Sequence, residues 1–537
     1  MELVIVAGGL GSRLAPLTDH VPKFLVNIGK ETGYVEMIRY WGTQFDLEDH
    51  GVTVIVHPKY VALVAEYHAL YFPKIRLTIK TVEVANGSAH AIMSTCGHLE
   101  GQSVLFTWCD VIPAIRDLAL DMLDPESNIV FTNYSNSNRY AMREVEPGVL
   151  KPVLDPSEQG GCFGLYYVGK FRQVEFKDGQ DFIDVIEQYG PLKEQVVSKI
   201  IDFGDMPKLR RTQSHADDAR SFNAVKFVGD YVLKEAVGPQ GKNIMKREIA
   251  WYKRLDELLE NPLDVRPAVP RTWIAADGTG FFMDRVQGVP IWKAWPEMSP
   301  ADRLYVIQQH FDTRRDLFNL DAQEVPLETL LRDVKTEAYT KLVDRYNEIR
   351  GVIDSFGPVT HVNGYELKEE DPLVTIKNVY DALERFYTND FPSQVGVRLY
   401  GFVHGDLQFS NAMVDMDTRK VTIIDPRGYF GKSELIGLED YDIGKLLYAL
   451  SGYDTFNTSR EFFITKEGAH LEFTIPAPST EGIEEWCRGT FIHVHYLWLA
   501  VCWLGLAQYI KNDPVKSMAA HYHGLMLAER ALSALYD

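Results

Sequence analysis

The chain has 537 residues, with 55 Lys and Arg against 75 Asp and Glu, so its formal net charge is −20. At about 150 residues per domain, this length predicts several domains or two large ones. Hydrophobic residues make up 46% and charged residues 24%, which are ordinary globular values and argue against disorder or a fibrous repeat. The acidic excess leaves no chain-wide basic footprint, so nucleic acid is not an expected partner.

Three features bear on the compartment. The five cysteines are far apart and form neither a paired metal spacing nor a disulfide ladder, which favours a reducing cytosol. The chain starts with a strand-like run at residues 3–6 and lacks the parts of a signal peptide. The longest apolar run, 496–510, is shorter than the about 20 residues that span a bilayer. We therefore expect a cytoplasmic protein without integral membrane contact, and a homo-oligomer stays open.

Over residues 3–202, short β-rich runs alternate with helical ones, which is typical of an α/β fold with a parallel sheet and crossover helices. Strands are predicted at 3–6, 52–57, 75–84, 104–108, 129–134, 163–168 and 197–201. Helices are predicted at 35–45, 60–71, 88–96 and 182–189. A polar stretch at 210–220 follows and marks the best boundary, so we expect an N-terminal domain over 1–211 and a linker over 212–220.

The second half opens differently. Residues 222–228 and 231–236 flank the turn Gly229-Asp230 and predict a β-hairpin, which a helix over 243–259 follows. Helices are then predicted at 301–318, 327–350, 374–387, 440–450 and 483–510, with an apolar, loop-rich block at 398–428. We expect an α+β domain over 221–537, with a small β-rich lobe at 221–290 and a helical lobe at 291–537.

A glycine-rich loop directly follows the first strand. Its candidate phosphate-binding residues are Gly8, Gly9, Gly11, Ser12, Arg13 and Lys23. Glycines in this position let backbone N–H groups approach phosphate oxygens, and Arg13 and Lys23 supply cations for phosphoryl chemistry. The alternatives are a tight turn without a ligand and a dinucleotide-binding fold, whose fingerprint lacks this Arg and the Pro22-Lys23 pair.

At these residues the sequence resembles the sugar-phosphate nucleotidylyltransferase family, over about the first 210 residues. The resemblance implies a Rossmann-like sheet and a reaction in which a phosphate oxygen attacks the α-phosphorus of a nucleoside triphosphate and pyrophosphate leaves. In-line transfer of this kind needs a divalent metal held by carboxylates. Asp110, after the buried strand at 104–108, and Asp202, in a late strand before a glycine, match the family's two metal positions and are expected to hold Mg²⁺.

Gly87-Ser88 resembles the family's base-binding turn, with an ordinary helix N-cap as the alternative. The family's Glu-Lys-Pro element is absent, and only Lys151-Pro152 stands in its place. The substrate of this half therefore stays open, and so does its nucleotide, for which CTP and UTP are both reasonable.

A second motif, His404-Gly405-Asp406, is followed by Asn411 and, fourteen residues further on, by Asp425. Phosphoryl transfer to a hydroxyl needs a group that accepts the hydroxyl proton, metal-holding oxygens and a cation on the nucleotide phosphates. Asp406 is the candidate for the first role, and Asn411 and Asp425 are the candidate Mg²⁺ ligands. Lys234 in the hairpin is expected to reach the phosphates of ATP, and Glu248 on the following helix to pair with Lys234.

This block resembles the aminoglycoside phosphotransferase and choline kinase family, a branch of the protein-kinase-like fold, over about residues 221–537. The resemblance implies a bilobal domain with a hinge at 281–288, and a loop-supporting role for Asp442. His404 is expected to fix the loop rather than to carry a proton. The protein-kinase glycine-rich loop and the Ala-Pro-Glu signature are missing, which disfavours a protein substrate.

A kinase makes a phosphate monoester and a nucleotidylyltransferase consumes one, so their fusion favours consecutive steps. We expect a bifunctional enzyme that phosphorylates a small sugar or polyol, X, with ATP and then forms NDP-X for surface polysaccharide synthesis. The alternative is a choline or amino-alcohol kinase joined to a CTP-dependent cytidylyltransferase that makes a CDP-linked head group. Two further alternatives are a degenerate regulatory half and an antibiotic-modifying kinase.

Overall fold

The computed structural model describes residues 1–44, 46–84, 86–113, 123–134, 140–154, 161–216, 223–259, 268–275, 279–390 and 399–535. The chain forms two compact units. The first comprises residues 1–217, 350–357 and 512–515, and the second comprises 218–349, 358–511 and 516–537.

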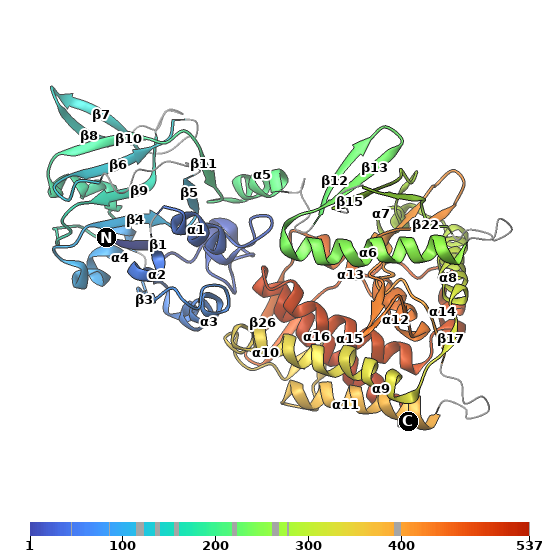
Figure 1. Cartoon of the computed structure of the whole chain (residues 1–537). Coiled ribbons are helices and arrows are strands. Elements are labelled where there is room, and N and C mark those ends of the chain that lie inside the picture. The colour runs from blue at the N-terminus through green and yellow to red at the C-terminus, as the bar shows by residue number, and fades with distance from the viewer. Residues whose placement is uncertain are drawn as a thin grey trace. The chain divides into compact units, whose positions relative to one another are not determined.

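A seven-stranded sheet forms the centre of the first unit (Figure 1). In spatial order its strands are β10 (Leu192–Val196), β6 (Asn128–Thr132), β9 (Cys162–Val168), β4 (Val104–Trp108), β1 (Glu2–Ala7), β2 (Val52–Val56) and β3 (Leu77–Thr81). The expectation of a parallel sheet is wrong for β9, which runs antiparallel to both β4 and β6. The described residues between β6 and β9 form a hairpin of β7 (Tyr140–Glu146) and β8 (Val149–Leu154) rather than a crossover helix, so the chain can re-enter the sheet in the opposite direction.

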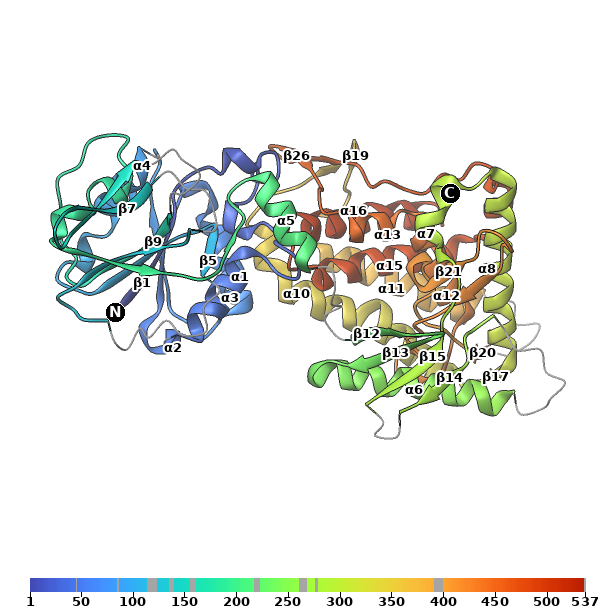
Figure 2. The ribbon, with the colours of Figure 1, turned by 90° about the horizontal axis from the view of Figure 1, so that it is seen from above.

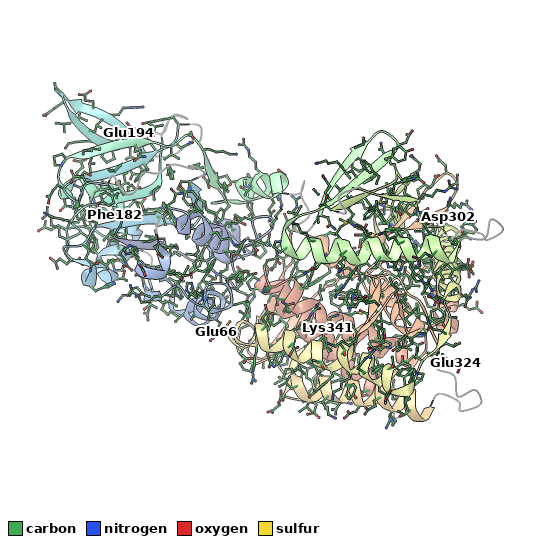
Figure 3. The ribbon with its side chains drawn as sticks, viewed as in Figure 1. Glu66, Phe182, Glu194, Asp302, Glu324 and Lys341 are labelled. Atoms are coloured by element: carbon green, nitrogen blue, oxygen red, sulfur yellow. The ribbon has the colours of Figure 1, made fainter. Side chains whose placement is uncertain are left out.

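The helices of this unit are α1 (Gly33–Gly42), α2 (Leu47–His50), α3 (Val61–Tyr71), α4 (Gly87–Thr95) and α5 (Met206–Ala216). Short 3₁₀ helices lie at Ser12–Leu14, Lys23–Leu25, Pro58–Tyr60, Gly97–Leu99, Phe182–Asp184 and Ile186–Tyr189. The hydroxyl of Thr32 caps α1 by accepting the N–H of Val35. Phe182 of this unit is labelled in Figure 3. It packs on Phe106 of β4 in the core of the unit, with the two ring centroids 5.0 Å apart.

Two sequence expectations for this unit need correction. The helix predicted over 182–189 is two 3₁₀ helices that meet at Val185, because the backbone there makes i→i+3 hydrogen bonds. The strand predicted over 197–201 is shorter and later: β11 (Ile200–Asp202) pairs with β5 (Val111–Pro113). β10, which the sequence did not predict, occupies the sheet edge just before it. Residues 212–216 of the predicted linker are the last residues of α5, and the rest of that linker lies outside the described residues.

The second unit begins with an antiparallel sheet. Its spatial order is β12 (Asn223–Val228), β13 (Tyr231–Ala236), β15 (Gly280–Asp284) and β14 (Thr272–Ile274). The long helix α6 (Gly238–Leu258) lies along β13 and β15 (Figures 1 and 2). Met245, Ile249 and Tyr252 are buried on one stripe of α6, at the i, i+4 and i+7 spacing of an amphipathic helix.

The remainder of the chain is mainly helical. Its helices are α7 (Ile291–Ala294), α8 (Pro300–Leu320), α9 (Leu327–Lys335), α10 (Lys341–Asp354), α11 (Pro372–Arg385), α12 (Glu439–Leu450), α13 (Tyr453–Thr458), α14 (Glu484–Thr490), α15 (His493–Tyr509) and α16 (Pro514–Ser533). Two π-helical turns lie at Thr336–Thr340 and Phe386–Asp390, and two 3₁₀ helices at Trp295–Glu297 and Phe409–Asn411. The first π turn interrupts the helix predicted over 327–350.

Short strands connect these helices. They are β16 (Val289–Pro290), β17 (Gln323–Glu324), β18 (His361–Val362), β19 (Tyr365–Glu366), β20 (Leu399–Phe402), β21 (Ala412–Val414), β22 (Val421–Ile423), β23 (Tyr429–Phe430), β24 (Ser433–Glu434), β25 (Ile436–Gly437), β26 (Ile464–Glu467) and β27 (His470–Phe473). β21 and β22 form a hairpin. Of the second motif, Asn411 directly precedes β21 and Asp425 lies two residues after β22.

Among the described residues, no single helix is long and apolar enough to cross a membrane. α14 and α15 have the required length and composition only together, and the chain bends by 99° between them. Trp498 and Trp503 of α15 are fully buried, with their indole N–H groups bonded to Tyr387 and Ser451.

His310 of α8 makes the second unit sensitive to acid. The side chain is fully buried, neither ring nitrogen has a hydrogen-bond partner among the described residues, and burial lowers its pKa to about 3. The unfolded chain takes up this proton near pH 6.5, so protonation favours unfolding below that pH. We expect this proton uptake by His310 to lower the free energy of unfolding by about 2 kcal/mol when the pH falls from 7 to 5.

Urea denaturation of wild type and His310→Phe at the two pH values measures this effect. The difference between pH 7 and pH 5 is expected to shrink by about 2 kcal/mol in the variant. His493→Gln, at an exposed position at the start of α15, is the control. An equal pH effect in wild type and His310→Phe would contradict the assignment.

Candidate active sites

The first candidate site lies at the carboxyl ends of two neighbouring parallel strands. β1 and β4 pair in parallel with Val6 opposite Trp108, so the loop after β1 and Asp110 after β4 leave the sheet at the same edge. Ligands of open α/β sheets bind at this edge.

The glycine loop itself is tightly built. A Cβ on Gly8 would lie 2.5 Å from the Val82 side chain, so a larger residue does not fit there. Gly11 has φ +73°, in the left-handed region that favours glycine, and its carbonyl accepts the Thr18 hydroxyl at 2.9 Å. Gly9 and Ser12 are exposed beside it. The loop therefore has a fixed turn and an open side.

Lys23, Asp110 and Asp202 converge on one point. Lys23 Nζ lies 2.5 Å from Asp110 Oδ2, and both side chains are buried. A Cβ on Gly204 would lie 3.0 Å from Asp110 Oδ2, 3.1 Å from Asp202 Oδ1 and 3.5 Å from Lys23 Nζ. Gly204 thus leaves an empty cradle between two carboxylates that are distant in the sequence.

This cradle fits Mg²⁺. The ion binds proteins through one or two carboxylates and takes its other ligands from water and substrate phosphates. Asp110 and Asp202 supply the carboxylates near Gly204, and β11 pairing with β5 places Asp202 opposite Val111, next to Asp110. Within the described parts of the chain, no group of three or more His, Cys, Asp or Glu side chains forms a metal site.

Lys208 of α5 is a member of this site that sequence reasoning missed. Its Nζ lies 2.6 Å from Asp202 Oδ2, so each of the two aspartates has a lysine partner. Lys208 lies six residues after Asp202 and just before the polar stretch 210–220 that predicts a domain boundary. Only the helical turn of α5 brings it back to the carboxylate, so the sequence spacing alone gave no signal.

Arg13 is exposed on the 3₁₀ helix Ser12–Leu14. Burial and the neighbouring Asp110 carboxylate raise the pKa of the Cys109 thiol to about 12, while Lys23 and Arg13 act in the opposite direction. Both cations are therefore within electrostatic range of the strand end that carries Asp110.

Gly87 and Ser88 begin α4 and touch the segment before Phe182. Gly87 has φ +86°, and a Cβ there would lie 2.0 Å from the carbonyl oxygen of Gln180. The Ser88 hydroxyl accepts the N–H of Phe182 at 2.8 Å and donates to Asp181 at 3.2 Å. The hydroxyl is thus engaged by two groups within the fold.

Gly204→Ala tests the cradle. The added methyl group would occupy the space between Asp110 and Asp202, so we expect Mn²⁺, used as a probe for Mg²⁺, to bind at least about 10-fold more weakly, with little change in thermal stability. Electron paramagnetic resonance of free Mn²⁺ measures this affinity. Gly42→Ala is the matched control, because its Cβ would meet only the Leu47 side chain at 3.9 Å. Equal Mn²⁺ affinity in Gly204→Ala and wild type would refute the metal assignment.

The second candidate site is in the second unit, where Lys234 meets two carboxylates. Lys234 on β13 is buried, and its Nζ lies 2.6 and 2.8 Å from the two oxygens of Glu248 on α6. It also lies 2.9 Å from Asp425 Oδ1, just after β22. Burial lowers the pKa of Lys234, but Asp425 and Glu248 outweigh it and raise the pKa above its usual value. Lys234 is therefore a fixed cation.

The loop 404–411 is held by buried groups. Asp442 of α12 accepts the N–H groups of His404 and Gly405 at 2.9 and 2.8 Å. His404 Nε2 bonds to the Ile424 carbonyl at 2.9 Å, and its Nδ1 lies 3.3 Å from the Asp406 N–H. Burial lowers the pKa of His404, so the ring is a neutral Nε2–H tautomer with both nitrogens engaged. His404 fixes the loop and is not free to shuttle a proton.

Asp406 and Asn411 lie together on this loop. The amide nitrogen of Asn411 donates to the carbonyl oxygen of Asp406 at 2.8 Å and to its Oδ2 at 3.1 Å. This use of the nitrogen leaves the amide oxygen as the atom that a Mg²⁺ ion would take. The backbone of Asn411 accepts the N–H of Ile424 at 2.8 Å, next to Asp425, so both candidate ligands come from one hairpin. The residues at this site thus also fit Mg²⁺.

Sequence reasoning missed two further groups around Asp406. Asp454 of α13 is buried and accepts the N–H of Ser410 at 2.9 Å, which anchors the loop from its far end. Lys445 of α12 places its Nζ 3.1 Å from Asp406 Oδ1. Lys445 follows Asp442 by three residues, so a helical wheel around Asp442 would have found it.

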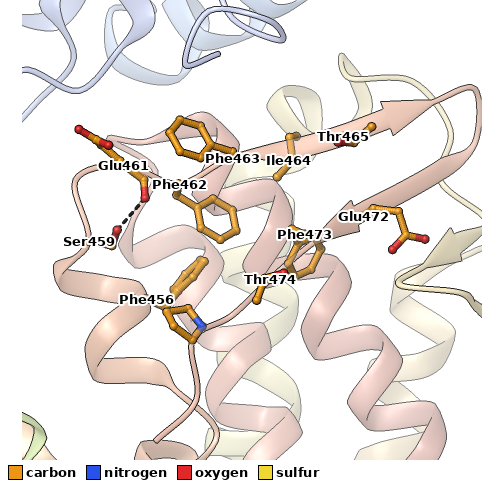
Figure 4. Close-up of a pocket in the computed structure, with 11 residues that line it drawn as sticks. Phe456, Ser459, Glu461, Phe462, Phe463, Ile464, Thr465, Glu472, Phe473 and Thr474 are labelled. Atoms are coloured by element: carbon orange, nitrogen blue, oxygen red, sulfur yellow. Dashed lines mark hydrogen bonds between the residues drawn. The ribbon is translucent and has the colours of Figure 1, made fainter. Parts of the chain in front are cut away.

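A separate cavity of about 480 Å³ lies between α13, β26 and β27 (Figure 4). Four phenylalanines line it: Phe456, Phe462, Phe463 and Phe473. Glu461 and Glu472 are at its rim. None of the predicted site residues contributes to its lining.

The family comparison matches residues 2–116 to the nucleotidyl transferase model. The N-terminal part of the chain is therefore a nucleotidyltransferase domain, with the glycine loop, Lys23 and Asp110 inside the matched segment.

Solved structures similar to the chain cover 40% to 41% of it. A putative glucose-1-phosphate thymidylyltransferase from Bacillus anthracis is 18% identical, with a TM-score of 0.34, over 41% of this chain and 96% of its own. A CTP:phosphocholine cytidylyltransferase from Streptococcus pneumoniae is 15% identical, with a TM-score of 0.31, over 40% and 98%. HddC from Yersinia pseudotuberculosis is 15% identical, with a TM-score of 0.30, over 40% and 98%. No curated protein matches the chain significantly.

Proposed function

We propose that the chain is a bifunctional enzyme that activates a small sugar or polyol, X, in two steps. The C-terminal part, over 221–537, phosphorylates X with ATP, and the N-terminal part, over 1–211, couples X-phosphate to CTP or UTP and releases pyrophosphate. The observation that carries the proposal is the meeting of Lys234, Glu248 and Asp425 beside a backbone segment that is hydrogen-bonded to the loop of Asp406, because such a set of groups would suit a second site for nucleotide phosphates.

In the proposed first step, Lys234 binds the phosphates of ATP and Glu248 holds the lysine in place. Asp406 accepts a hydrogen bond from the hydroxyl of X and takes its proton as the oxygen bonds to the γ-phosphorus. Burial raises the pKa of Asp406, but the charges of Lys445 and Arg427 outweigh it, so the pKa is lowered and the carboxylate is ionised at neutral pH. Mg²⁺ at Asn411 and Asp425 would neutralise charge on the nucleotide.

In the proposed second step, the backbone of the loop at Gly8, Gly9 and Gly11 with Ser12 holds the triphosphate. Arg13 and Lys23 offset the charge that develops at the α-phosphorus and on the leaving pyrophosphate. Asp110 and Asp202 would hold Mg²⁺, which would supply positive charge for the reacting phosphates. The turn at Gly87 and Ser88 would contact the base through its backbone.

The proposed product is an activated building block for a surface polysaccharide, made in the cytoplasm from ATP and a second nucleotide. Mass spectrometry of the full chain with Mg²⁺, ATP, CTP, UTP, GTP and a pool of unphosphorylated sugars, polyols and amino alcohols tests this. A new NDP-conjugate mass is the expected result, and it names X and the base. A CDP-amino alcohol would establish the alternative chemistry. X-phosphate without a conjugate would contradict the coupling, and ATP left unconsumed would contradict the kinase step.

A further inference from the structure

In the two steps above, the amine of Lys445 only helps to keep Asp406 ionised, yet it lies directly against this proposed acceptor of the hydroxyl proton. α12 presents Asp442 and Lys445 three residues apart, on one face. Asp442 fixes the backbone of His404 and Gly405, and Lys445 Nζ then lies 3.1 Å from Asp406 Oδ1. The same helix that positions the loop therefore places a cation beside the site of proton transfer.

The surroundings keep this amine charged and oriented. Only 13% of the Lys445 side chain is exposed, and Nζ lies 5.9 Å from the ring centroid of Tyr441 and 5.3 Å from that of Tyr448. Burial lowers the pKa of Lys445, but Cys502 and Asp406 outweigh it and raise the pKa above its usual value. The two oxygens of Asp406 have different partners. Oδ2 accepts the side-chain amides of Gln408 and Asn411, whereas Oδ1 faces Lys445.

The other lysine of the site, Lys234, faces two carboxylates. Three acceptor oxygens surround Lys234 Nζ at 2.6, 2.8 and 2.9 Å, and they belong to Glu248 and Asp425. Two negative charges therefore lie against its single positive charge, whereas Lys445 Nζ pairs with the one carboxylate of Asp406. A phosphoryl group in flight carries charge on three equatorial oxygens and needs cations around it.

We infer that Lys445 is a second cation of the phosphoryl-transfer site, whose ammonium contacts the phosphoryl group as it passes to the hydroxyl held by Asp406. The inference rests on the proposed kinase step. In that step the hydroxyl oxygen forms a bond to the γ-phosphorus, the bond from phosphorus to the β–γ bridging oxygen breaks, ADP leaves with the electron pair, and the proton goes to Asp406. Lys445 forms no bond and gives up no proton.

The geometry supports this reach. An acceptor hydroxyl bound to Asp406 lies about 2.7 Å from the carboxylate, and its phosphorus lies about 3 to 3.5 Å further on before transfer. The amine is on a four-carbon stem and starts 3.1 Å from the same carboxylate, so a small change of side-chain torsion takes it to an equatorial oxygen.

The test uses the full chain with MgADP as the nucleotide probe and aluminium fluoride as a mimic of the phosphoryl group in flight, in the presence of the pooled acceptors. Isothermal titration calorimetry compares wild type, Lys445→Met, Lys445→Arg and the control Lys377→Met, whose lysine is exposed and pairs with Asp381 on α11. Binding that Lys234→Met abolishes is assigned to this site, which separates it from nucleotide bound by the N-terminal domain.

We expect aluminium fluoride to tighten MgADP binding in wild type, and Lys445→Met to lose roughly 100-fold of this gain while its affinity for MgADP alone stays within about twofold. Lys445→Arg is expected to keep part of the gain, and Lys377→Met all of it. Unchanged MgADP affinity also shows that the variant is folded. A full gain in Lys445→Met would overturn the inference and leave the kinase standing. Absence of Lys234-dependent MgADP binding in wild type would overturn the proposed kinase itself.

Discussion

Asp406→Asn is expected to slow phosphorylation of X by about 1,000-fold, because the amide cannot take the hydroxyl proton. The loop should keep its shape, since Asp442 and Asp454 hold its backbone independently of the Asp406 side chain. ADP release with the acceptor found by mass spectrometry measures the rate. Formation of NDP-X from supplied X-phosphate is expected to be unchanged in the same protein.

Asp417→Asn is the control for this variant. Asp417 is exposed in the turn after β21, in the same unit and with the same change of charge. If Asp406→Asn and Asp417→Asn had equal rates, Asp406 would not be the proton acceptor.

Asp110→Asn is expected to slow the second step and to leave the first step unchanged. It should reduce NDP-X formation from X-phosphate by at least about 100-fold, because it removes a charged metal ligand and the partner of the buried Lys23. ADP release by the C-terminal part is expected to stay at the wild-type rate. Pyrophosphate release measures the second step.

The control here is Asp49→Asn, at an exposed position of the short helix α2. A loss of pyrophosphate release in both variants would indicate general damage to the N-terminal domain. Normal release in Asp110→Asn would contradict the metal assignment.

Hydrophobic patterning predicted most of the regular elements, since a short apolar run such as 104–108 indicates a buried strand and a longer run with helical spacing such as 440–450 indicates a helix. It failed for β9, because strand direction depends on the connection and not on the strand's own residues. It also failed for 182–189, where two 3₁₀ helices stand in place of an α-helix and the N–H of Phe182 bonds to Ser88. The strand connection and the bond to Ser88 both depend on parts of the chain that are distant in the sequence.

The residues of the candidate sites also divide into those that the sequence predicted and those that it missed. Motif residues that follow a strand, such as Asp110 and Asp425, were predicted because strand ends and turns place them at a sheet edge or hairpin. Lys208 and Lys445 were missed, since each reaches its aspartate from a helix and a lone lysine on a helix is usually solvated. Gly204 was noted only as part of a pattern, and its role as the space between two carboxylates required coordinates.

The measurement that tests the central claim most directly follows the γ-phosphoryl group of ATP into the products. The full chain is incubated with free X, unlabelled CTP or UTP, and ATP labelled with ¹⁸O in its γ-phosphoryl group, and the products are analysed by mass spectrometry. The account predicts that the label appears in NDP-X, in the phosphate next to X. Label confined to inorganic phosphate, or NDP-X formed without label, would contradict a kinase that feeds the nucleotidyltransferase of the same chain.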